Sequence, residues 1–145
     1  MLLREIKTQT AELGPDANTL GTFARNPHYS WQSHAFYLDR VKGHINAIGE
    51  RTAELQQIRY AVLPWQEQAI TEVTSQAAQV AASTQAAIVY LNENQGRRFV
   101  AEYRDHLTTI ADSSEAMKQA VDRFLDYEKT QQKLRDLQNE LDLGG

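Results

Sequence analysis

The chain has 145 residues, 41% of them hydrophobic and 23% charged, so it suits one globular domain over 1–145 rather than a disordered segment. Its 15 Lys and Arg against 19 Asp and Glu give a net charge of -4, which argues against nucleic-acid binding by charge neutralisation and against a basic membrane-surface module. With 7 Gly and 3 Pro, the chain has too few turn residues for a β-sandwich or β-barrel.

The first predicted element is a short amphipathic helix over residues 1–13. Its inward positions recur at steps of three and four, at Leu3, Ile6, Thr10 and Leu13. Gly14 and Pro15 then match the usual stop at a helix C-terminus. Residues 14–29 are predicted to be a linker that holds at most a turn or two of helix around 17–24.

A long helix is predicted over residues 30–63, with Ser30 as its N-cap. Its inward positions follow a heptad pattern at Trp31, His34, Leu38, Val41, Ile45, Ile48, Thr52, Leu55, Arg59 and Val62. Gly43 and Gly49 each lower helix propensity by about 1 kcal/mol. We expect them to mark the close approach of a neighbouring helix, the alternative being that the helix simply tolerates them.

Pro64 interrupts this pattern, because proline lacks an amide donor and clashes with the preceding turn. It either opens a new helix over 64–94 that folds back as a hairpin, or kinks one long helix. The similar lengths of the two segments favour the hairpin. The inward positions of the second segment are Ile70, Val73, Ala77, Val80, Thr84, Ala87 and Leu91.

A polar turn at 92–96 precedes the last predicted helix, over 97–143. A capping-box pattern at 112–115 makes a break there the alternative to one continuous helix. The inward positions run at Val100, Tyr103, Leu107, Ile110, Ser114, Met117, Val121 and Phe124. The pattern then shifts phase, which suggests a change of neighbour, and the apolar stripe continues at Tyr127, Thr130, Leu134, Leu137 and Leu141.

These segments predict an all-α fold: an elongated antiparallel bundle of three long helices, with the short N-terminal helix packed alongside. The predicted core consists of Trp31, Leu38, Val41, Ile45, Ile48, Leu55, Ile70, Val73, Val80, Leu91, Val100, Leu107, Ile110, Met117, Val121 and Phe124.

No motif in the chain indicates a reaction. The absence of cysteine excludes disulfides, thiolate metal sites and cysteine nucleophiles. The sequence also lacks a Glu-x-x-His pair of the di-iron type and a glycine-rich phosphate loop. We therefore predict no enzyme, and assign no catalytic, cofactor-binding or metal-ligating residue.

Residues 28–37 concentrate aromatic and histidine side chains. Apolar walls with a few polar groups are typical of small-molecule pockets. The candidate ligand or partner contacts are therefore His28, Trp31, His34 and Tyr37. The other interpretation is an aromatic plug that closes one end of the bundle.

The last predicted helix, about 70 Å long, exceeds its two long partners of about 45–50 Å, so its C-terminal end should overhang them. The candidate self-association residues on this overhang are Leu134, Leu137 and Leu141. An isolated helix end of this length is marginal in water, so we expect the stripe to be covered. The N-terminal helix, through Leu3 and Ile6, and a second copy of the chain are the two candidates; a solvated end is the alternative.

Function is predicted only by class: a non-enzymatic structural or protein-interaction bundle whose partner is another protein or a second copy of itself. The alternative is a small-ligand or metal-binding bundle that uses residues 28–37. No nucleic-acid partner is expected, and no apolar run approaches the roughly 20 residues of a membrane span. We expect a soluble protein, cytoplasmic, or extracytoplasmic if a signal peptide has been removed, since a chain without cysteine suits either redox environment.

Overall fold

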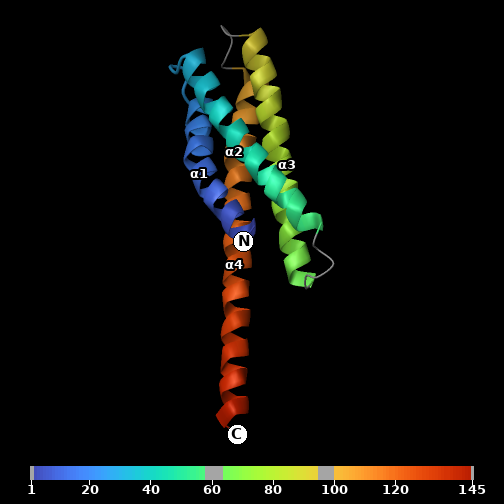
Figure 1. Cartoon of the computed structure of the whole chain (residues 1–145). Coiled ribbons are helices and arrows are strands. Elements are labelled where there is room, and N and C mark those ends of the chain that lie inside the picture. Colours follow the sequence, from blue (N-terminus) through green and yellow to red (C-terminus); the bar gives the residue numbers. More distant parts are fainter. Residues whose placement is uncertain (1, 58–63, 95–99, 145) are drawn as a thin grey trace.

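The computed structural model describes residues 2–57, 64–94 and 100–144. Within these ranges the chain forms four helices and no strand: α1 (Leu2–Ala24), α2 (Trp31–Gln57), α3 (Pro64–Glu93) and α4 (Ala101–Gly144). Successive helices run in opposite directions along one axis (Figure 1). The predicted all-α antiparallel bundle is confirmed.

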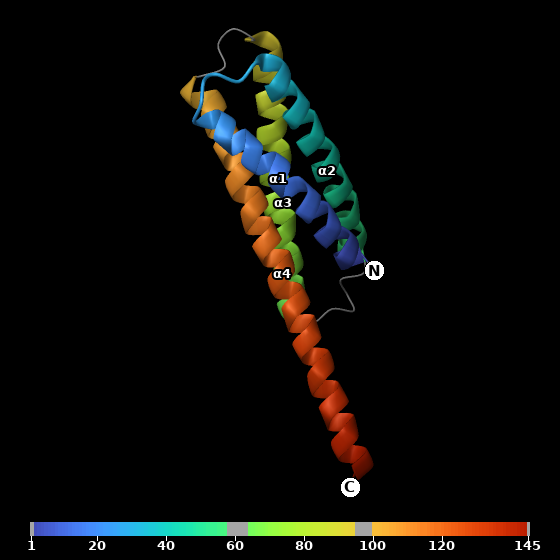
Figure 2. The same ribbon diagram turned by 90° about the vertical axis from the view of Figure 1, so that its left-hand side faces the viewer.

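The helices form a ring in which α1 packs against α2 and α4, and α3 packs against the same two helices (Figures 1 and 2). The hairpin between α2 and α3 is confirmed, because α3 begins at Pro64 and runs back along α2. Gln56 of α2 donates a hydrogen bond of 3.3 Å from Nε2 to Oγ1 of Thr74 in α3. The connection over 58–63 and the predicted helix start over 97–99 lie outside the described residues.

The predicted end of the first helix at residue 13 is wrong, and so is the linker predicted over 14–29 for residues 14–24; only residues 25–29 of it connect α1 to α2. Helix α1 continues through Gly14 and Pro15 and ends at Ala24. The bundle therefore has four long helices, rather than three with a short one alongside.

Packing explains why α1 continues across the proline. Its buried face keeps the same phase on both sides of Pro15, at Ile6, Thr10, Leu13, Ala17, Leu20 and Ala24. Pro15 lies on the exposed face, as does Ala11, so the Ala11 carbonyl that loses its helical donor can accept a hydrogen bond from water. Burial of a whole helix face thus outweighs the cost of about 3 kcal/mol that proline imposes inside a helix.

The buried faces of the other helices follow the predicted spacing. In α3 the predicted inward residues, from Ile70 to Leu91, are the residues that are buried. Helix α4 runs unbroken through residues 112–115, as predicted. Two core predictions need correction: Trp31 is only half-buried, and Val100 is 40% exposed because it precedes the first turn of α4.

The close helix approach predicted at Gly43 and Gly49 is also wrong, since a Cβ at either position would meet nothing within 4 Å. The close approach occurs instead at Gly21 of α1. A Cβ there would lie 3.0 Å from the Cβ of Ala111 in α4. Gly21 therefore lets α1 pack tightly on α4, within the segment predicted to be a linker.

No described helix combines the length and apolarity that crossing a membrane requires.

Replacement of Pro15 by alanine is expected to stabilise the bundle. Alanine restores an amide donor to the Ala11 carbonyl and removes the ring clash, so the free energy of unfolding should rise by about 1–3 kcal/mol in urea denaturation. Pro64→Ala is the control: at the first position of α3 the amide has no helical acceptor, and the change should stay within about 0.5 kcal/mol. A Pro15→Ala variant no more stable than this control would contradict a continuous α1.

Glycine-to-alanine substitutions at positions 21 and 49 should have opposite effects. Gly49→Ala meets no neighbour and should raise the free energy of unfolding by about 0.5–1 kcal/mol through helix propensity. Gly21→Ala meets Ala111 and should lower it by about 1 kcal/mol through overpacking. Thermal unfolding followed by circular dichroism measures both variants, and equal shifts would show that α1 and α4 are not in close contact at Gly21.

Candidate functional site

The aromatic–histidine segment predicted from the sequence gathers around Phe23, near the C-terminus of α1. The Phe23 ring stacks on Tyr29 at a centroid distance of 4.1 Å. It also contacts His34 at 4.8 Å and the edge of Tyr37 at 5.6 Å. Phe23 and His34 are each 3% exposed, so this cluster belongs to the core of the bundle.

The cluster extends into α4 and α3 through Tyr103, which is fully buried. The Tyr103 hydroxyl and the His34 Nδ1 share a hydrogen bond of 2.7 Å. The Tyr103 ring stacks on Tyr90 of α3 at 5.2 Å. One turn below the start of α4, Arg104 donates a hydrogen bond of 3.0 Å from Nε to the carbonyl of Ala24, the last residue of α1. Aromatic packing and two long-range hydrogen bonds therefore join all four helices at this end.

The four predicted contact residues thus have different environments. His34 is buried and Tyr37 half-buried, and both contact Phe23. Trp31 is half-buried against the core, and His28 is exposed. The packing of His34 and Tyr37 on Phe23 agrees with the interpretation of this segment as an aromatic plug.

Removal of the Tyr103 hydroxyl should destabilise the bundle. Tyr103→Phe leaves the buried His34 Nδ1 without its partner at 2.7 Å, and the free energy of unfolding should fall by about 1–2 kcal/mol. Tyr127→Phe is the control, because Tyr127 is 59% exposed and its hydroxyl can bind water, so the change should stay below about 0.5 kcal/mol. Equal stability of the two variants in urea denaturation would contradict a structural role for the His34–Tyr103 bond.

A polar contact between α1 and α2 escaped the sequence analysis. Asp16, whose side chain is 7% exposed, accepts a hydrogen bond of 3.0 Å at Oδ2 from Arg40 Nε, and His44 Nε2 lies 3.3 Å from the same oxygen. The Arg40 guanidinium also lies over the Phe36 ring, 5.5 Å from its centroid. Asp16 falls in the predicted linker, and for that reason it was not considered. Its contacts fix the register of the two helices.

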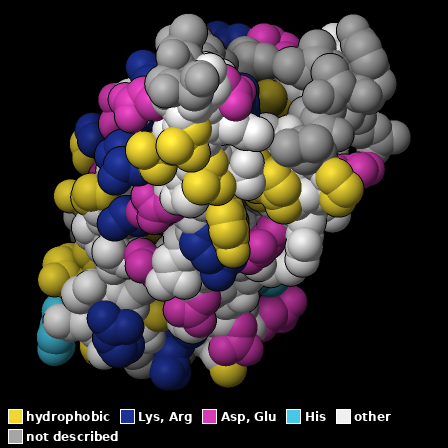
Figure 3. Space-filling view, turned by 90° about the horizontal axis from the view of Figure 1, so that it is seen from below, with side chains coloured by type: hydrophobic (Ala, Val, Ile, Leu, Met, Phe, Trp, Pro, Cys, Tyr) yellow, Lys and Arg dark blue, Asp and Glu magenta, His cyan; other side chains and the backbone are white. Residues whose placement is uncertain are grey.

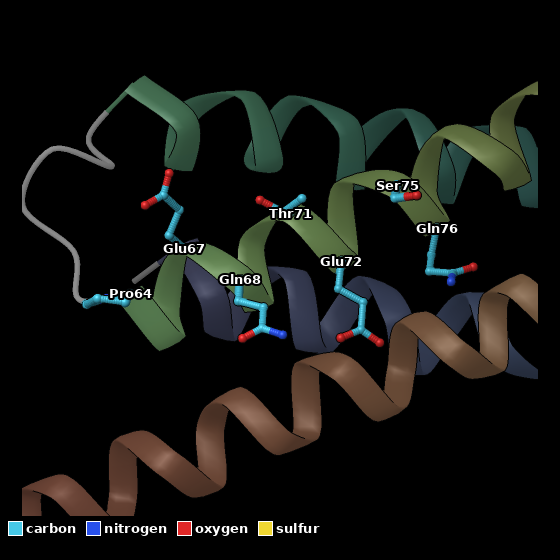
Figure 4. A pocket seen from close by; sticks show the side chains of 7 residues that line it. All are labelled: Pro64, Glu67, Gln68, Thr71, Glu72, Ser75 and Gln76. Atoms are coloured by element: carbon cyan, nitrogen blue, oxygen red, sulfur yellow. The ribbon is translucent and has the colours of Figure 1, made fainter.

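The surface hollow along α3 is open to solvent rather than enclosed. It is lined by Pro64, Glu67, Gln68, Thr71, Glu72, Ser75 and Gln76 (Figure 4). All seven side chains come from a single helix, and Glu72 is paired with Arg123 of α4 at 2.7 Å. It is a shallow, solvated face. Within the described residues no three histidine, aspartate or glutamate side chains gather into a metal site.

The C-terminal part of α4 has no packing partner among the residues that the structure describes. Helix α4 spans about 66 Å at 1.5 Å per residue, against about 45 Å for α3, and extends well beyond the other helices (Figures 1 and 2). Every residue from 132 to 142 is exposed. We call residues 132–144 the protruding segment. The predicted overhang is confirmed.

The leucine stripe, which we define as Tyr127, Thr130, Leu134, Leu137 and Leu141, follows one side of this part of α4. The three leucines are 56%, 54% and 76% exposed. In the view from below, hydrophobic side chains gather near the centre, with acidic and basic side chains on both sides (Figure 3). The described side chains of α1 do not cover the stripe, since Ile6 is fully buried within the bundle, where it lines a small cavity with Leu55 and Phe124. The Leu3 side chain, the other candidate, lies outside the described residues.

The leucine stripe does not continue the face of α4 that packs in the bundle. The bundle face ends at Phe124, and its next positions in phase are Glu128 and Gln131, which are half-buried. The stripe lies one residue earlier along the helix, a rotation of about 100°. At its upper end the Tyr127 ring contacts Trp65 in the first turn of α3, with centroids 5.5 Å apart. The stripe therefore faces the side of α4 on which α3 begins.

Comparison with known proteins assigns no family, since no family model, curated protein or solved structure matches the chain.

Proposed function

We propose that this chain is a non-enzymatic protein-interaction module in which a four-helix bundle presents the protruding segment of α4 to another polypeptide. The observation that carries the proposal is the row of exposed leucines at Leu134, Leu137 and Leu141, on a helix that extends beyond its own bundle. Exposed apolar stripes on soluble helices mark interaction surfaces.

The size of the apolar surface supports this role. Complete burial of a leucine side chain contributes about 1.5–3 kcal/mol. Because each stripe leucine is already 24–46% covered, by difference from its exposed fraction, a partner would gain about 1–2 kcal/mol from each. Three leucines supply about 3–6 kcal/mol, enough for a weak or moderate complex once other contacts at the rim are added.

The bundle itself serves as a rigid base. Its core extends along α1 from the small cavity at Ile6, near one end of that helix, to the aromatic cluster around Phe23 and Tyr103 at the other end. A small-ligand role for residues 28–37 has less support, because His34 and Tyr37 are engaged in packing against Phe23.

The proposal is tested by photo-crosslinking. A photoreactive amino acid at Gln138, beside the stripe, should form adducts with a polypeptide in an extract of the source cells, whether a second copy or another protein. The same group at Ala81, on the exposed face of α3, is the control and should give few adducts. The adducts should disappear when the three stripe leucines are replaced by glutamine. Yields at 138 that equal those at 81, or that survive the glutamine substitutions, would contradict the proposal.

A further inference from the structure

We infer that the occupant of the leucine stripe is a second copy of this chain, bound through its own protruding segment in the antiparallel direction. Such pairing presupposes the proposed interaction role of the stripe. It is supported by the charges that flank the stripe, and by the position of the stripe relative to α3.

The residues next to the stripe differ on its two flanks. The positions before Tyr127, Leu134 and Leu141 are Asp126, Lys133 and Glu140. On the other flank, the positions after Thr130 and Leu137 are both glutamine, at 131 and 138. Within the protruding segment, one flank thus carries two opposite charges, Lys133 and Glu140, separated by two helical turns, and the other flank is neutral.

These flanks complement each other only in the antiparallel direction. In a parallel pair the preceding flank of one helix meets the following flank of the other, so Lys133 would face a neutral glutamine. In an antiparallel pair each flank meets its own copy, and Lys133 faces Glu140 of the second copy while Glu140 faces its Lys133. The two ion pairs are related by a two-fold axis, as a closed dimer requires.

The same register also covers the leucines. With the two-fold axis between residues 135 and 136, Leu134 packs against Leu137 of the second copy, and Leu141 packs against its Thr130. Gln131 meets Gln138 of the second copy on the neutral flank. All six leucines of the dimer then lie in the interface, and no charge is left inside it.

The position of α3 opposes the parallel arrangement. Because Tyr127 contacts Trp65, the stripe leads upward toward the first turn of α3. A second helix running parallel along the stripe would continue into its own bundle at this level, where α3 of the first copy already lies (Figure 2). An antiparallel helix brings its bundle to the far end of the protruding segment, where the described part of the chain leaves the space free.

Sedimentation equilibrium of the full chain measures the association. The interface is short, so we expect a dimer with a dissociation constant on the order of 100 µM. Replacement of Leu134, Leu137 and Leu141 by glutamine should give a monomer with an unchanged melting temperature, because these side chains do not contact the bundle. A wild-type chain that stays monomeric at about 500 µM, several times the expected constant, would overturn the inference.

Charge reversal tests the direction. Lys133→Glu and Glu140→Lys should each weaken the dimer about tenfold, since each replaces two ion pairs by two repulsive pairs. The double variant should restore wild-type association. Lys129→Glu is the matched control, because the same charge change falls on the side of the helix opposite the stripe. Single variants that associate like the control would overturn the antiparallel arrangement.

A distance measurement gives an independent result. The chain has no cysteine, so a single cysteine at exposed Gln119 carries a spin label without interference. In the antiparallel dimer the two labels lie about 50 Å apart along the paired axis, and in a parallel dimer they lie side by side. A short distance would overturn the inference. If the crosslinker at 138 captures a different protein while the chain alone remains monomeric, the inference fails and the proposed interaction role survives.

Discussion

The whole bundle depends on burial of the apolar face of α4 between Tyr103 and Phe124. Helices α1 and α3 cover this face from two sides, and α2 closes the ring by packing on both of them. Because α1 and α3 meet mainly through α2 and α4, the position of α4 determines how the other helices are placed. The buried hydrogen bond between Tyr103 and His34 then fixes α4 relative to the start of α2. The apolar face sets the packing, and the polar contacts set the register.

Sequence periodicity predicted three of the four helices because steps of three and four residues are direct consequences of helix geometry. Residues from Ile70 to Leu91 show this most clearly, since every predicted inward position is buried. The prediction failed where local propensity and tertiary packing disagree. Gly14 and Pro15 favour a helix end, but burial of Leu13, Ala17 and Leu20 continues the helix. Local sequence patterns do not reveal how strongly the apolar face of α1 packs on α4, which lies more than eighty residues further along the chain.

The candidate sites were predictable to different degrees. The stripe of Leu134, Leu137 and Leu141 could be recognised from its spacing and from the expected length of the last helix. The environment of His34 could not, because it depends on Tyr103 and Phe23, which come from other helices. Asp16 was missed because the second half of α1 was predicted to be a linker. Once α1 is taken as a helix, Glu12 and Asp16 fall one turn apart on a single face, opposite His44.

The continuity of α4 has a mechanical consequence. From Ala101 to Leu143 this helix contains neither proline nor glycine, so it runs as one stiff rod from the aromatic cluster to the end of the protruding segment. If the proposed role holds, a partner bound to this segment would lie at a fixed distance from the bundle, set by the number of residues after Phe124. The direction in which the leucine stripe faces is fixed in the same way. One residue inserted before Tyr127 would rotate the stripe by about 100° around the helix axis, whereas one added helical turn would leave its direction nearly unchanged. In the proposed interaction role, the number of residues along this single helix would therefore set both the distance and the direction at which a partner is held.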